Sequence, residues 1–119
     1  MQNFRRISVW EKGHAFTLKI YKLSQSFPKE ETYGLTSQLR RASTSIPTNI
    51  AEGCLKNTNP EYSRFLYISL GSASEVEYLL MLCKDLELID ENKYKMLSEE
   101  IQEIKKMLTA LIKKVKTVK

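Results

Sequence analysis

Apolar residues recur three, four and seven positions apart along most of the chain, a spacing typical of amphipathic helices. Short polar connections separate the four periodic segments, which predict helices at about residues 9–26, 35–52, 60–87 and 91–116. No segment alternates strictly between apolar and polar residues, so no strand is expected. Because short connections make consecutive helices neighbours, we predict an all-α, antiparallel up-down-up-down four-helix bundle that forms one domain over residues 1–119.

Capping residues support these boundaries. Ser8, Asn59 and Asp90 are suitable N-caps for the first, third and fourth helices. Pro60 fits the first helical position of the third helix, and Gly53 can close the second.

The third predicted helix is apolar nearly all round. Between Phe65 and Cys83 only Glu75 and Glu77 are charged, whereas a bundle helix needs about three of seven positions buried. One stripe of apolar residues can fill the core of the bundle. The remaining apolar residues of this helix predict contact with another subunit. The residues expected at that interface are Leu66, Leu70, Ala73 and Leu80.

Charge is distributed unevenly along the chain. The formal net charge is +5, with residues 1–24 and 91–119 each at +4 and residues 25–90 at −3. A basic segment can attract nucleic acid, but lysine also suits the solvated C-terminal part of a helix. The nucleic-acid reading assigns phosphate contacts to Arg5, Arg6, Lys105, Lys106, Lys113, Lys114, Lys116 and Lys119.

The segment RRASTSIPTNIAEG, residues 40–53, places a proline inside the second predicted helix. Pro47 has no N–H group, so the carbonyl of Ser43 loses its usual donor, and we expect a kink or a helix restart near Ile46. One interpretation is a bent core helix. The other is a polar site where Arg40, Arg41, Asn49 and Glu52 converge across the kink, to bind a phosphate backbone or to join subunits.

Catalytic and metal-binding patterns are weak. His14 is the one histidine, and Cys54 and Cys83 lie 29 positions apart with no C-x-x-C pair. No glycine-rich phosphate loop is present. We therefore expect no enzyme activity, metal or cofactor. The sequence shows neither a signal peptide nor an apolar run of roughly 20 residues, so we expect a cytoplasmic protein with reduced thiols and no membrane contact.

Two runs, YGLTSQLRRASTSIPTNIAEG and EYSRFLYISLGSASEVEYLL, resemble the four-helix-bundle family encoded within intervening sequences of bacterial 23S ribosomal RNA genes. This chain has serine at Ser69 where the family usually has alanine, and leucine at Leu55 after the glycine. The resemblance implies a ring-like homopentamer. The chain is similar also to accessory proteins of diversity-generating retroelements, which are basic pentameric bundles that engage nucleic acid and a reverse transcriptase.

The resemblance carries over seven motif residues, with a structural or ligand-binding role left open: Arg40, Arg41, Ser45, Pro47, Asn49, Glu52 and Arg64. We expect a non-enzymatic oligomeric bundle that binds structured RNA or DNA through basic surfaces. The alternative is a protein–protein scaffold with no nucleic-acid role.

Overall fold

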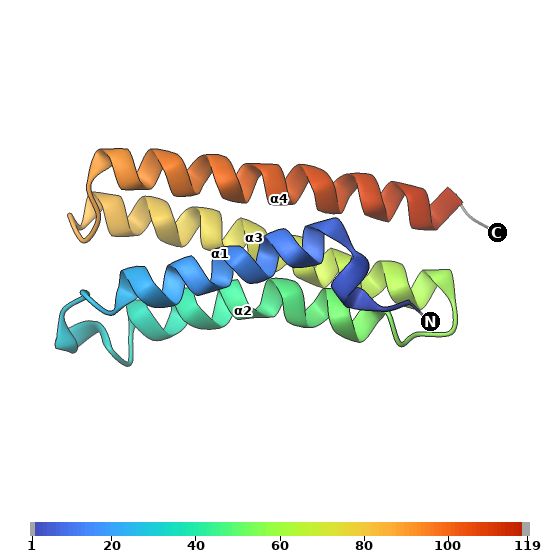
Figure 1. Ribbon diagram of the computed structural model, residues 1–119. Helices are drawn as coiled ribbons and strands as arrows, with labels where there is room; N and C mark the ends of the chain where they lie inside the picture. Colours follow the sequence, from blue (N-terminus) through green and yellow to red (C-terminus); the bar gives the residue numbers. More distant parts are fainter. Residues whose placement is uncertain (1, 118–119) are drawn as a thin grey trace.

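The computed structural model describes residues 2–117, which form an elongated helical bundle with principal extents of 48 × 23 × 19 Å (Figure 1). The α-helices are α1 (Ser8–Ser24), α2 (Leu35–Gly53), α3 (Asn59–Asp85) and α4 (Glu91–Thr117). Two 3-10 turns, η1 (Phe4–Arg6) and η2 (Lys29–Glu31), precede α1 and α2. No strand occurs within the described residues.

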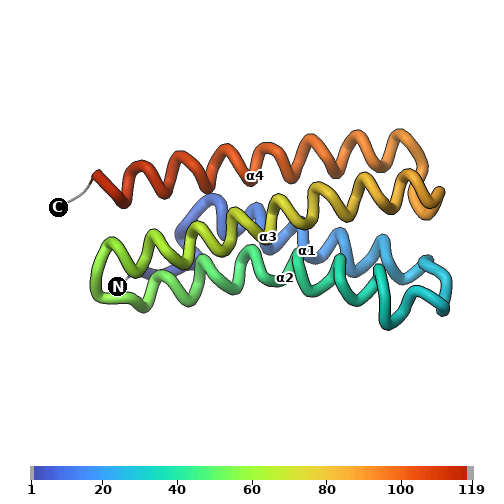
Figure 2. The backbone as a smooth tube through the Cα atoms, turned by 180° about the vertical axis from the view of Figure 1, so that it is seen from behind, coloured from blue at the N-terminus to red at the C-terminus, as the bar shows by residue number. Residues whose placement is uncertain are grey.

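The connections alternate between the two ends of the bundle. The α1–α2 and α3–α4 connections lie at one end, and the α2–α3 connection lies at the other, where both chain termini also lie (Figure 1). Seen from behind, α3 lies beside α2 (Figure 2), and α3 also packs against α4, while α1 packs mainly on α2.

The helix ends differ from the sequence expectation by one or two residues. α3 ends at Asp85 because Glu87 adopts a left-handed conformation (φ 62°), which directs the Leu88 N–H to the Cys83 carbonyl at 2.8 Å. α1 ends at Ser24, where the backbone continues in i to i+3 hydrogen bonds instead of helical ones.

The predicted N-caps are partly correct. The Asp90 carboxylate accepts from the Lys93 N–H at 2.7 Å, as expected of a cap. Thr58, not Asn59, caps α3 by accepting from the Glu61 N–H at 3.3 Å. Ser8 is already helical and Ile7 precedes it without a side-chain cap.

α2 continues through Pro47 without interruption, so the prediction of a helix restart near Ile46 is wrong. The Ser43 carbonyl, which lacks the N–H of residue 47, accepts instead from the Thr17 hydroxyl of α1 at 3.0 Å. This hydroxyl shares its one hydrogen between the Ser43 carbonyl and the Gly13 carbonyl of α1, which lies at 2.9 Å. Ser69 of α3 donates to the neighbouring Ile46 carbonyl at 2.8 Å. Side chains from both flanking helices therefore supply backbone contacts beside the proline, which removes much of the reason for a break.

Each helix contributes fully buried side chains to one core. Leu66, Ala73 and Leu80 are 0% exposed in this core, so the prediction that they face another subunit is wrong. Leu70 is only partly exposed. The surplus apolar residues of α3 lie on its opposite side, which we call the α3 outer face: Tyr67, Ile68, Gly71, Ser74, Tyr78 and Met81.

By length and composition alone, α3 is apolar enough to cross a membrane, and 33% of its most apolar window is buried in the bundle. The sequence expectation concerned an uninterrupted apolar run of roughly 20 residues, and Glu75 and Glu77 interrupt α3. The core helix of a globular bundle passes the same test, and the inner side of α3 packs on α2 and α4.

Candidate functional site

Three hollows lie in a row where α3 meets α4. They have volumes of about 550, 350 and 530 Å³. Tyr67 and Lys116 line both the first and the second, and Thr109 and Lys113 line both the second and the third. We call this continuous depression the α3–α4 groove.

Cationic side chains dominate the groove. The basic residues that line it are Arg64, Lys105, Lys106, Lys113 and Lys116. Glu77 is the carboxylate among the lining residues. Because cations outnumber carboxylates in one narrow strip, the groove is suited to a polyanion.

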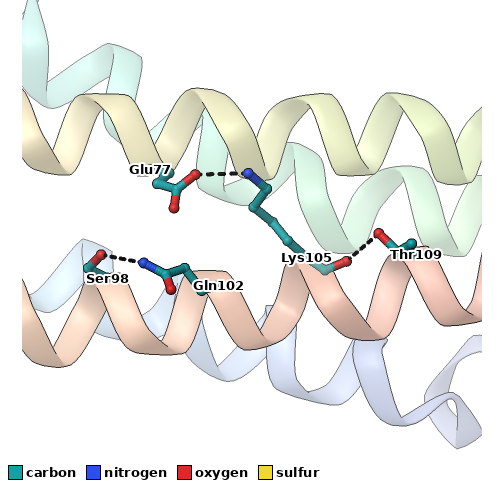
Figure 3. A network of polar contacts seen from close by, with 5 residues as sticks. All are labelled: Glu77, Ser98, Gln102, Lys105 and Thr109. Carbon is teal, nitrogen blue, oxygen red and sulfur yellow. Dashed lines mark hydrogen bonds and ion pairs between the residues drawn. The ribbon is translucent and has the colours of Figure 1, made fainter.

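One ion pair crosses the groove. The Lys105 ammonium of α4 donates to the Glu77 carboxylate of α3 at 2.8 Å, while the Thr109 hydroxyl donates to the Lys105 carbonyl (Figure 3). Both partners of the pair are about one third exposed, so it contributes little stability. Gln102 donates to the Ser98 hydroxyl at 3.2 Å on the same stretch of α4.

The groove brings together only part of the predicted basic set. Lys105, Lys106, Lys113 and Lys116 line it, whereas Lys114 lines a separate hollow of about 300 Å³ beside Lys56 and Tyr62. Arg5 and Arg6 are exposed on η1, and Lys119 lies outside the described residues.

Arg64, Tyr67 and Glu77 were not predicted to share this site with the lysines. Their proximity depends on the register of α3 against α4, which no spacing within one helix reveals.

Arg40 of α2 mainly forms hydrogen bonds to α1. Its Nε donates to the Ser24 hydroxyl at 2.7 Å, a terminal nitrogen donates to the Tyr21 carbonyl at 3.2 Å, and the guanidinium lies 4.8 Å from the Tyr21 ring centroid. This arginine therefore closes the C-terminal end of α1 with charge-assisted hydrogen bonds.

Arg41 is exposed and lines, together with Arg40 and several hydroxyl residues, a hollow of about 650 Å³. Neither Asn49 nor Glu52 lines that hollow, so the predicted convergence of the four residues is wrong. The physical reason is that α2 remains one helix through Pro47 and keeps these side chains in different turns.

Ser45 is the motif residue that joins α2 to α3 by a hydrogen bond. The Ser72 hydroxyl donates to the Ser45 hydroxyl at 2.8 Å. Asn49 donates to the Ser45 carbonyl at 2.8 Å and to its hydroxyl at 2.9 Å. The Asn49 bonds therefore stay within α2, Pro47 is buried beside Gly13 of α1, and Glu52 is exposed.

The histidine, both cysteines and Tyr62 lie outside the groove. His14 stacks on Trp10, with 5.1 Å between ring centroids. Both thiols are free and buried, and burial raises the pKa of Cys54 and raises that of Cys83 to about 11. Burial also raises the pKa of Tyr62, whose hydroxyl donates to Gln2 at 3.2 Å. Among residues 2–117, no group of three or more histidine, cysteine, aspartate or glutamate side chains could hold a metal ion.

The bundle has two oppositely charged ends. Segments 2–6, 52–64 and 110–117, at the end with the termini, contain seven basic and two acidic residues, a net charge of +5. Segments 22–34 and 84–93, at the opposite end, contain four basic and six acidic residues, a net charge of −2. The groove runs toward the basic end.

The α3 outer face is mostly apolar and exposed, with the exposed Glu75 on the same side of the helix. Tyr67, Ile68, Tyr78 and Met81 are between 41% and 55% exposed. A Cβ atom added at Gly71 would contact nothing within 4 Å, so packing within the chain does not require glycine there. The face therefore has the composition of a contact surface.

The chain is similar to known proteins over most of its length. The family model described as "23S rRNA-intervening sequence protein" matches residues 5–110. No curated protein matches the chain significantly. A crystal structure of a protein of unknown function from the S23 ribosomal protein family of Bacteroides thetaiotaomicron is 30% identical, with a TM-score of 0.82. The match covers 88% of this chain and 95% of that chain.

Proposed function

The chain belongs to the 23S rRNA-intervening sequence protein family, and from this premise we propose that it is a non-enzymatic, oligomeric helical bundle that binds nucleic acid through the α3–α4 groove. The supporting observation is the row of five cationic side chains opposed by one carboxylate. Such a row neutralises successive phosphates and releases their counterions.

The proposed ligand is a structured RNA or a DNA duplex, recognised by charge and shape. Tyr67 is the one aromatic side chain among the groove residues, so the groove offers little for reading bases by stacking. The expected binding is therefore tolerant of sequence and strongly dependent on salt.

The proposed assembly is a cytoplasmic homopentamer of antiparallel up-down-up-down bundles. The alternating connections support the antiparallel course, and the α3 outer face supports self-association. Gly71 would let a neighbouring helix approach closely on that face.

The test of nucleic-acid binding is fluorescence anisotropy with a labelled structured RNA and a labelled DNA duplex over a salt series. Lys106→Gln combined with Lys113→Gln should lower affinity and reduce the salt slope by about 0.9 per lost phosphate contact on a duplex. Lys22→Gln, which changes an exposed lysine on α1 away from the groove, is the matched control. Equal affinities and slopes in all three proteins would refute the groove as the binding surface.

The second candidate function is a protein scaffold without a nucleic-acid role, favoured by the apolar α3 outer face. Light scattering after size-exclusion chromatography would compare Tyr78→Ser with Leu18→Ser, an equally exposed apolar residue on α1. A lower mass for Tyr78→Ser alone would support assembly through the outer face. A stable oligomer that binds neither RNA nor DNA at low salt would favour the scaffold.

A further inference from the structure

The hollow that Arg41 lines, between the C-terminal half of α1 and α2, has no role in the proposed function. It has a volume of about 650 Å³, and we call it the α1–α2 hollow. Two arginines line it and no carboxylate does. Arg40 is held by its hydrogen bonds to α1, whereas Arg41 is exposed and has no ion-pair partner among residues 2–117. The hollow therefore offers an unpaired positive charge to a partner.

The α3 outer face carries the opposite charge. Its stretch 65–83 contains two charged residues, Glu75 and Glu77. Glu77 is paired with Lys105 across the groove, but Glu75 is exposed and has no ion-pair partner within the described part of the chain. A second copy of the same stretch has no cation to offer this carboxylate, whereas the α1–α2 hollow has Arg41. Charge therefore favours contact between these two different surfaces.

Hydrogen bonds between α2 and α3 relate positions on the two helices along the long axis of the bundle. The Ser69 hydroxyl of α3 donates to the Ile46 carbonyl of α2. The next contact joins Ser72 to Ser45. Residue numbers thus rise along α3 as they fall along α2, so each turn of one helix can be assigned to the turn of the other that lies level with it.

The two surfaces lie level with each other along the bundle. One further turn, about 3.6 residues beyond the second contact, places Glu75 level with Arg41. By the same count, residues 67–81 of the α3 outer face are level with residues 36–48, the part of α2 that lines the hollow. A rotation about an axis that runs along the bundles does not shift one copy along the next. Surfaces that lie level therefore meet when such a ring closes.

The α1–α2 hollow also suits the apolar side chains of the α3 outer face. Tyr21 and Tyr33 line it with exposed rings. The hydroxyls of Thr44 and Thr48 already donate to carbonyls of their own helix, each at 2.8 Å, so covering them leaves neither donor without a partner. On the opposing surface, Gly71 has no side chain to keep the two helices apart.

We propose that the α3 outer face of one copy docks in the α1–α2 hollow of the next, where Glu75 pairs with Arg41. Each copy uses α3 for one contact and α1 with α2 for the other, so the contacts are head-to-tail and can close into a ring. The inference rests on the self-association in the proposed function and deepens it by naming the second surface of the subunit contact.

The experiment is charge reversal, followed by light scattering after size-exclusion chromatography over a dilution series. Glu75→Arg and Arg41→Glu each bring two like charges together, so each should raise the concentration of half-dissociation by about tenfold or more. The double variant restores an unlike pair and should return to within about threefold of the wild type. Glu103→Arg on α4 and Arg6→Glu on η1 change exposed charges outside both surfaces and should leave the dissociation unchanged.

Equimolar mixing of the two single variants gives a second measurement. In the mixture, the reversed α3 outer face of one variant meets the reversed hollow of the other, and their unreversed surfaces also meet. Every mixed contact then joins unlike charges, so the mixture should have a higher mass than either variant alone. That gain would also show that both variants are folded.

Unchanged dissociation in both single variants would overturn the pairing, as would a double variant no tighter than the weaker single variant. If the wild type is an oligomer in that case, its self-association uses another contact, and this inference alone fails. A wild type that is monomeric at every concentration would overturn both this inference and the assembly on which it rests.

Discussion

The hydrogen bond from Thr17 to the Ser43 carbonyl should become dispensable when Pro47 is replaced. Thr17 is 8% exposed and Ser43 is 0% exposed, so this carbonyl is shielded from water. In Thr17→Val the side-chain volume is nearly kept, but the carbonyl loses its donor, which should lower the free energy of unfolding by about 1–3 kcal/mol. In a Pro47→Ala background the N–H of residue 47 can reach the same carbonyl, so the cost should fall below about 1 kcal/mol.

Urea denaturation of the four proteins, at one fixed protein concentration, measures this coupling as a double-mutant cycle. Thr48→Val is the matched control, because its hydroxyl donates at 2.8 Å to the Thr44 carbonyl on the exposed side of the same helix. Its cost should lie within about 0.5 kcal/mol in either background. Equal costs of Thr17→Val with and without Pro47 would refute the idea that α1 compensates for the proline.

The remaining predictions concern α3. Gly71→Ala should stabilise the isolated subunit by up to about 1 kcal/mol, because alanine has a higher helix propensity than glycine and the added methyl meets no atom. The same methyl should weaken any assembly through the α3 outer face. Urea denaturation measures the first effect, and light scattering measures the second. Glu77→Gln should release Lys105 and tighten RNA binding in anisotropy, and no change would exclude Lys105 from the contact. Glu87→Gly should raise the unfolding free energy by about 1 kcal/mol, because Glu87 has φ 62°; a loss would mean that its side chain is needed. The pKa of Cys83 rises from 9.0 to about 11, so its contribution to stability is present below pH 9 and lost as pH rises toward 11; Cys83→Ala should flatten that decline.

Helix positions followed from the sequence because the period of apolar residues is a local property. In α4 the repeat of Leu97, Ile101, Ile104 and Leu108 predicts a core stripe, and all four are buried. Pro47 alone likewise predicts that the Ser43 carbonyl loses its helical N–H donor. The replacement donor, Thr17, could not be predicted, because the pairing depends on how α1 rests against α2.

The rotation of α3 could not be predicted for a related reason. Its residues are apolar or small on every side, so Leu66 and Tyr67 are equally plausible core positions by pattern. Contact with α2 and α4 selects Leu66, which is 0% exposed, and leaves Tyr67 49% exposed. The groove depends on the same rotation, which brings Arg64 of α3 close to Lys116 of α4.

The opposite charges at the two ends of the bundle affect how fast and in which orientation it meets a partner. Net charges of +5 and −2 lie near opposite tips of a molecule 48 Å long, which gives it an electric dipole. In the field of a polyanion such a dipole experiences a torque that turns the basic tip forward before any contact forms. Collisions would then begin near the productive orientation, and added salt would slow association by weakening this alignment.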